Sequence, residues 1–228
     1  MVNNKVCVIV GGADVICAYS AKEMAKNGYV TAIIDTEIDN AKKIADEICT
    51  FGGLAKAYEG NCRDYESLSG VRGLIFAEFG KCKVIVNNIQ AAADCGTDID
   101  CVLTSARAFS ADMSGEFGCS IVNICPSGAI ADEAVELTKK MAVNLADEGV
   151  RVNAIVYGNV VARSNRNEFY NDDNTPTESA REILDEIPMG RFGKPEEVVG
   201  ALSYLSDPVA ASYTTGTVIR VDGGASAK

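Results

Sequence analysis

Short apolar runs along the chain alternate with longer segments whose apolar residues recur every three or four positions. The runs Val6–Val10 and Val84–Val86 are apolar at every position, which is typical of parallel strands covered by helices on both faces. We predict strands at Lys5–Val10, Tyr29–Asp35, Ala55–Gly60, Lys83–Asn88, Ser120–Cys125, Arg151–Val156 and Thr217–Asp222. The longer segments predict helices at Ala18–Lys26, Asp39–Phe51, Tyr65–Phe79, Asp98–Met113 and Glu133–Asp147.

This alternation of strand and helix predicts an α/β fold with a doubly wound, seven-stranded, mostly parallel sheet. Ligands of such sheets bind beyond the carboxyl ends of the strands, so the residues that follow the strands are the functional candidates. The Asn- and Asp-rich stretch Ser164–Thr177 predicts a loop, and Lys194-Pro195-Glu196-Glu197 predicts the start of a helix that runs to about Ser206. At this length, we expect residues 1–228 to form a single domain.

Composition narrows the classes of partner. Apolar residues make up 47% of the chain and charged residues 23%, a balance typical of globular proteins. The formal net charge is −11 and no cluster of Lys and Arg interrupts it, so the chain would repel nucleic acid and anionic membranes. The sequence begins almost directly with a strand, and it has no apolar run long enough to span a bilayer. These features predict a cytoplasmic protein.

Nine cysteines stand in a chain that has no histidine. None of them forms a Cys-x-x-Cys pair, so the usual ligand spacing of zinc and iron–sulfur sites is missing and we predict no metal site. Most lie inside apolar runs, where a thiol behaves as a small hydrophobe, and we interpret them as reduced core residues. Metal binding or redox sensing is the alternative. The nine are Cys7, Cys17, Cys49, Cys62, Cys82, Cys95, Cys101, Cys119 and Cys125.

Five segments in order along the chain carry a family resemblance. They are Val86-Asn87-Asn88, Ile121-Val122-Asn123-Ile124, Arg151-Val152-Asn153-Ala154-Ile155-Val156, Ile187 through Glu197, and Val221-Asp222-Gly223-Gly224. On these segments the chain resembles the short-chain dehydrogenase/reductase family over essentially its whole length. The resemblance implies a Rossmann-like fold and a nicotinamide dinucleotide as cofactor.

The first strand of this family leads into a Thr-Gly-x-x-x-Gly-x-Gly turn, whose glycines let the backbone approach a pyrophosphate at a helix N-terminus. The corresponding segment here runs from Val10 to Cys17. Gly11 matches the first glycine, and the resemblance implies that Gly11 and Ile16 contact the cofactor. Val15 and Cys17 replace the other two glycines, and Asp14 adds a like charge beside the phosphates, so cofactor affinity should suffer. The alternative is a plain strand-to-helix turn that holds no ligand.

Further positions match the family's cofactor site. Asp35 closes the second strand, where an acidic side chain binds the adenosine ribose and repels a 2′-phosphate, so NAD is favoured over NADP. Asn61 and Cys62 match the residues at the adenine edge, Asn88 matches the asparagine near the cofactor ribose, and Gly158 follows the sixth strand. The alternative is a solvated strand end at Asp35 and turn residues elsewhere.

Catalysis in the family uses a tyrosine, a lysine four residues later, a serine and an asparagine. None of the eight tyrosines here has a lysine at that spacing, and about a dozen residues are missing between the fifth strand and the next helix. Pro126 stands at the serine position, beside Ser127, and Asp98 aligns with the asparagine. Ser127 and Tyr157 remain as candidate catalytic residues, whereas Lys139 and Lys140 lie too far along their helix to serve as relays.

Two functional hypotheses follow. The first is a non-catalytic or weakly active protein with a dinucleotide fold, in which NAD binds weakly or not at all. The second is an active NAD-dependent oxidoreductase that acts on a small carbonyl or alcohol substrate with rearranged residues. The helix Asp132–Ala146 is more apolar than one sheet face requires, and the family pairs subunits through it and Asp98–Met113. The resemblance therefore implies a homo-oligomer, either a dimer or a tetramer.

Overall fold

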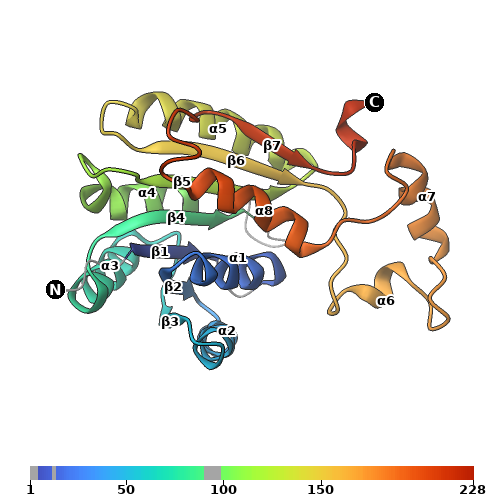
Figure 1. The fold of residues 1–228 in the computed structure, drawn as a ribbon, viewed down its shortest axis with the longest axis horizontal. Helices are drawn as coiled ribbons and strands as arrows, with labels where there is room; N and C mark the ends of the chain where they lie inside the picture. Colours follow the sequence, from blue (N-terminus) through green and yellow to red (C-terminus); the bar gives the residue numbers. More distant parts are fainter. Residues whose placement is uncertain (1–4, 12–13, 90–98) are drawn as a thin grey trace.

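The computed structural model describes residues 5–11, 14–89 and 99–228, and its centre is a seven-stranded sheet (Figure 1). The strand order is β3-β2-β1-β4-β5-β6-β7, and every neighbouring pair of these strands is parallel. The doubly wound α/β prediction is therefore confirmed, and the sheet is wholly rather than mostly parallel. The strands are β1 (Lys5–Val10), β2 (Tyr29–Asp35), β3 (Leu54–Glu59), β4 (Cys82–Asn88), β5 (Ser120–Pro126), β6 (Arg151–Tyr157) and β7 (Val218–Val221).

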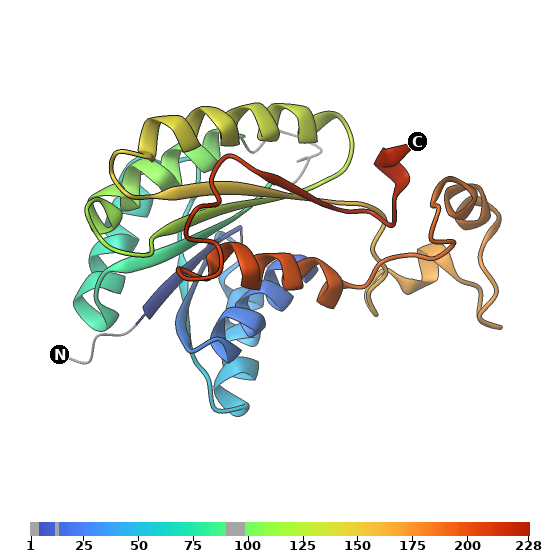
Figure 2. The same cartoon turned by 45° about the horizontal axis from the view of Figure 1, so that its top comes forward.

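Helices cover both faces of the sheet, as Figure 2 shows. One core cluster joins the sheet to α3, α4 and α5, and a second joins its other face to α1, α2 and α8. The strand arrows point toward the end of the molecule where α6 and α7 project from the main body. The helices are α1 (Val15–Lys26), α2 (Ile38–Thr50), α3 (Tyr65–Phe79), α4 (Ile99–Met113), α5 (Ala129–Leu145), α6 (Arg166–Phe169), α7 (Glu178–Glu186), α8 (Pro195–Ser206) and the 3₁₀ turn η1 (Ala225–Ala227).

The cysteines support the core interpretation for most of the described positions. Successive strand residues face opposite sides, so in β1 Val6 and Val8 enter one cluster while Cys7 enters the other. Burial raises the pKa of the Cys7 thiol, which therefore stays neutral. Cys49 is exposed and Cys62 is half-buried, and Cys95 lies outside the described residues. The buried thiols are Cys7, Cys17, Cys82, Cys101, Cys119 and Cys125.

The structure corrects the predicted loop at Ser164–Thr177. This stretch contains α6 and an isolated antiparallel bridge between Tyr170 and Pro176. The reason is apolar packing, because the ring of Phe169 lies 4.7 Å from that of Phe192 between centroids, and Tyr170 meets Phe192 edge-on. The Asn and Asp residues that favoured a loop supply the turns between these contacts.

The start of α5 is a second correction. The sequence predicts it at Glu133, whereas α5 begins at Ala129. Gly128 has a φ of +127°, a value that favours glycine and lets the chain turn out of β5 directly into the helix. Ile130 and Ala131 are then buried against the sheet, which fixes the extra turn.

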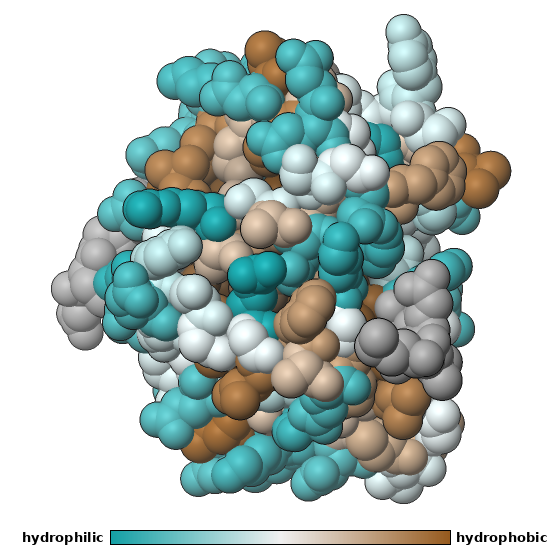
Figure 3. Space-filling view, turned by 90° about the vertical axis from the view of Figure 1, so that its left-hand side faces the viewer, coloured by the Kyte–Doolittle hydropathy of each residue, from teal (hydrophilic) through white to brown (hydrophobic). Residues whose placement is uncertain are grey.

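Two features bear on partners. No helix in the described part of the chain is long and apolar enough to cross a membrane. Leu103 of α4 and Val143 of α5 are exposed, but the homo-oligomer stays a prediction. At the end of the molecule opposite α6 and α7, apolar and hydrophilic residues intermingle (Figure 3).

Candidate functional site

The carboxyl ends of β1 and β4 meet at Gly11 and Asn88. Gly11 has a φ of +74°, its N–H donates to the carbonyl of Ile34, and a Cβ there would lie 3.3 Å from the carbonyl oxygen of Asn88. The Asn88 side chain donates from Nδ2 to the Gly11 carbonyl at 3.4 Å. Asn88 is 8% exposed, and its Oδ1 has no donor among the residues that the structure describes. A buried acceptor in this state favours a ligand that brings a donor.

The turn after Gly11 ends in a capped helix. The Asp14 Oδ1 accepts the Cys17 N–H at 2.7 Å, and the Asp14 backbone is extended, so Asp14 is the N-cap of α1. The Ile16 side chain is 4% exposed and packs into the core between α1 and the sheet. Ile16 could therefore meet a cofactor only through its backbone.

The predicted adenosine residues gather at the ends of β2 and β3. Asp35 pairs in register with Glu59, and its Oδ1 accepts the Glu37 N–H at 2.8 Å. Two residues after β3, the Asn61 Oδ1 accepts the Arg63 N–H at 3.0 Å in a side-chain turn. Cys62 packs partly against the core. Parallel pairing brings Asp35 and Asn61 to one edge, as the sequence predicts.

The predicted catalytic residues gather at the ends of β5 and β6. Pro126 pairs in register with Tyr157, and the Ser127 N–H donates to the Tyr157 carbonyl at 2.7 Å. Ser127 is exposed. A Cβ on Gly158 would lie 3.0 Å from Asp222 Cα, so glycine is needed there for packing whether or not a ligand binds.

The electrostatics around Tyr157 oppose ionisation of its phenol. Burial, followed by the nearby Asp14, Cys17 and Cys125, raises the Tyr157 pKa well above its ordinary value. Burial also raises the pKa of the Cys125 thiol to about 11, although the guanidinium of Arg220 acts in the opposite direction. A tyrosine that moves protons in catalysis needs the reverse shift.

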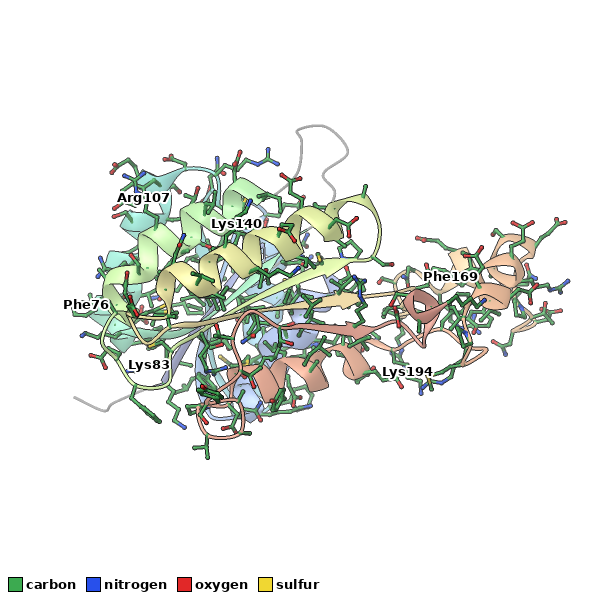
Figure 4. The ribbon with its side chains drawn as sticks, turned by 90° about the horizontal axis from the view of Figure 1, so that it is seen from above. Phe76, Lys83, Arg107, Lys140, Phe169 and Lys194 are labelled. Carbon is green, nitrogen blue, oxygen red and sulfur yellow. The ribbon has the colours of Figure 1, made fainter. Side chains whose placement is uncertain are left out.

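The lysines of α5 do not supply that shift. Lys139 and Lys140 are both exposed, and Lys139 forms an ion pair with Glu136 at 3.2 Å. In Figure 4, Lys140 lies over the helix layer, away from the projecting part of the molecule that carries Phe169. The Asp98 position lies outside the described residues.

A buried polar chain runs beneath this part of the edge, from α4 to α5. The Ser105 hydroxyl donates to Asn87 Oδ1 at 2.7 Å, and Asn87 Nδ2 donates to Asn123 Oδ1 at 2.9 Å. The Asn123 Nδ2 then donates to the Thr138 hydroxyl at 2.9 Å, which in turn donates to the Ala134 carbonyl. The chain fixes β4 and β5 between the two helices.

Sequence reasoning missed three features of this edge. The pattern of an acidic residue before the first helical turn could have identified the Asp14 cap. The proximity of Arg220 to Cys125 follows from the pairing of β7 with β6, which the sequence does not place. The orphaned Asn88 Oδ1 left no signal in the sequence.

Family profiles and curated relatives cover almost all of the chain. The short chain dehydrogenase profile matches residues 5–173, and the enoyl-(acyl carrier protein) reductase profile matches residues 129–226. An uncharacterized oxidoreductase of Haemophilus influenzae is 32% identical over 98% of this chain and 94% of its own length. The uncharacterized oxidoreductase UxuB of Bacillus subtilis is 28% identical over 96% of this chain and 94% of its own length.

A solved structure gives the same result. The fold is similar to that of a proposed D-mannonate oxidoreductase from Haemophilus influenza with bound NAD, with a TM-score of 0.88 and 29% identity. The similarity covers 99% of this chain and 96% of that one. With profiles, relatives and fold in agreement, the chain belongs to the short-chain dehydrogenase/reductase family.

Proposed function

We propose that this chain is a dinucleotide-fold protein that binds NAD weakly and does not use the tyrosine–lysine chemistry of its family. One observation carries the proposal: burial, followed by the carboxylate of Asp14 and the thiols of Cys17 and Cys125, raises the pKa of Tyr157, the candidate catalytic tyrosine at the end of β6. A general base or acid works best when its pKa lies near the working pH. The phenol of Tyr157 is therefore poorly suited to accept or deliver the proton that accompanies hydride transfer.

Residues on the other half of the edge support dinucleotide binding. Gly11 keeps the backbone conformation of a close approach, and the buried Asn88 Oδ1 can accept from a ribose hydroxyl. Asp35 and Asn61 would hold the adenosine ribose and the adenine edge, respectively. The relative of known structure holds NAD. A bound nicotinamide cofactor would carry the hydride, which NAD accepts and NADH donates.

Two measurements test this proposal. Calorimetry should give heat with NAD, NADH or ADP-ribose at millimolar concentration, and its absence for all three overturns the binding half. Oxidation of NADH in the presence of a broad panel of ketones and aldehydes should be no faster with the wild type than with Tyr157→Phe. Turnover clearly above that control overturns the statement that the chain does not use the tyrosine–lysine chemistry of its family.

A second candidate function is an active NAD-dependent oxidoreductase for a small carbonyl or alcohol. The observation that favours it is the exposed Ser127, which a 2.7 Å backbone bond holds beside Tyr157. Ser127 would polarise a carbonyl, and Tyr157 would donate the proton as a weak acid. For this candidate, Ser127→Ala must lower kcat as strongly as Tyr157→Phe does, without a matching change in NAD binding.

A further inference from the structure

A carboxylate of the protein, that of Asp14, already caps the N-terminus of α1. The first N–H groups of a helix, together with its dipole, attract a phosphate when a ligand brings one. Here the Asp14 carboxylate takes the Cys17 N–H at 2.7 Å, while the Asp14 carbonyl accepts the Ala18 N–H at 2.9 Å. A pyrophosphate at this helix would find the Cys17 N–H already taken and would lie beside the charge of Asp14.

The charge of Asp14 also acts beyond its own helix. After burial, Asp14 is the next cause of the raised pKa values of Cys17 on α1 and of Tyr157 at the end of β6. The carboxylate therefore acts on the space between α1 and β6, where a dinucleotide would cross the sheet edge. A ligand with two phosphates would meet a like charge along this path.

The neighbouring acceptor favours a ligand that brings a hydroxyl group. Asn88 is more than nine-tenths buried, and its Oδ1 has no donor within residues 5–11, 14–89 and 99–228. Its Nδ2 is held by the Gly11 carbonyl, which fixes the orientation of the amide. A sugar hydroxyl can donate to Oδ1, whereas a phosphate oxygen cannot.

We propose that Asp14 makes this site select an uncharged nucleoside such as adenosine over the diphosphate-linked dinucleotides. The inference rests on the proposed function, because it concerns the same site and assumes that this edge binds a nucleotide-like ligand. It gives Asp14 the role of a specificity determinant: the carboxylate caps the helix in place of the ligand's phosphate.

Calorimetric titration of the full chain with adenosine, ADP-ribose and NAD tests the proposal. In Asp14→Asn the amide oxygen still accepts the Cys17 N–H, so the cap is kept and only the charge is removed. Asp207 is the matched control, because its Oδ1 also accepts backbone N–H groups, those of Val209 at 2.7 Å and Ala210 at 2.9 Å. It lies near Lys5 and Arg151, at the starts of β1 and β6 and therefore at the opposite edge of the sheet.

The wild type should bind adenosine at least as tightly as ADP-ribose. Asp14→Asn should raise the affinity for ADP-ribose and NAD about tenfold and leave that for adenosine unchanged, while Asp207→Asn alters neither. If ADP-ribose and NAD bind the wild type as tightly as Asp14→Asn, the role of Asp14 is overturned while the proposed function stands. If no variant binds any of the three ligands, both are overturned.

Discussion

The carboxyl edge of the sheet has two halves that differ in kind. At the ends of β1, β2 and β3, Gly11, Asp35 and Asn61 keep residue types and backbone geometry that suit an adenosine. At the ends of β5 and β6, Pro126 and Tyr157 pair in register, and burial, followed by the nearby Asp14, raises the pKa of the phenol. Under the proposed function, one scaffold carries a half that binds the ligand and a half that lacks the usual proton chemistry.

Under the proposed function, ligand binding and proton transfer depend on different parts of this fold. Parallel pairing places all strand ends on one edge whatever follows them, so the adenosine half does not depend on the residues after β5. The proposed function attributes the loss of proton transfer to the short connection from β5 into α5, which begins at Ala129. The following predictions test each half separately.

The largest effect should come from the interior beneath the second half. Asn123→Ala leaves Asn87 Nδ2 without its acceptor and removes the donor to Thr138, which should lower the free energy of unfolding by about 3 kcal/mol. Denaturant titration measures the loss, and Asn144→Ala, at an exposed position on α5, should change it by less than about 0.5 kcal/mol. A loss as small as that of Asn144→Ala would mean that the buried hydrogen bonds of Asn123 contribute little to the stability of β4 and β5.

The regular elements could be predicted well from the sequence because their signals are local. The bounds of β1, β2 and α3 match the predicted ranges, since each apolar pattern stops at turn or polar residues. The start of α5 was predicted four residues late because its first residues depend on Gly128 leaving β5 at a positive φ. The segment around α6 was missed because its stability comes from Phe192, more than twenty positions away.

The sequence predicts where the candidate site lies, but it does not predict the ionisation of the residues in it. Strand ends meet by topology, so Asp35 and Asn61, or Gly11 and Asn88, could be brought together from their order alone. The ionisation of Tyr157 depends on how deeply its ring is buried and on side chains from α1 and β5, which no spacing encodes.

A smaller effect, on ligand affinity, should come from Asp35 at the end of β2. Asp35→Ala removes a charged acceptor from the end of β2 and should weaken adenosine and ADP-ribose binding about tenfold, or roughly 1.4 kcal/mol. Calorimetry measures the change, and Asp46→Ala, which removes the same charge from an exposed position on α2, should leave both affinities intact. Equal affinities for Asp35→Ala and the wild type would place the ligand outside the first half.

The smallest effect should appear only in alkali, at Tyr157. A raised pKa means that the folded chain keeps the phenolic proton at pH values where the unfolded chain has lost it. The stability that Tyr157 contributes is therefore complete below about pH 10 and is lost as pH rises toward the folded pKa, by at most about 1.4 kcal/mol per pH unit.

Tyr29, whose pKa burial raises to about 12, adds a similar loss to the wild-type curve, so the informative quantity is the difference between variants. Urea titrations at pH 9, 10 and 11 should show a shallower decline for Tyr157→Phe than for the wild type, and an unchanged decline for Tyr213→Phe at an exposed ring. Parallel curves for Tyr157→Phe and the wild type would mean that the phenol ionises freely, and the contrast between the two halves would lose its electrostatic basis.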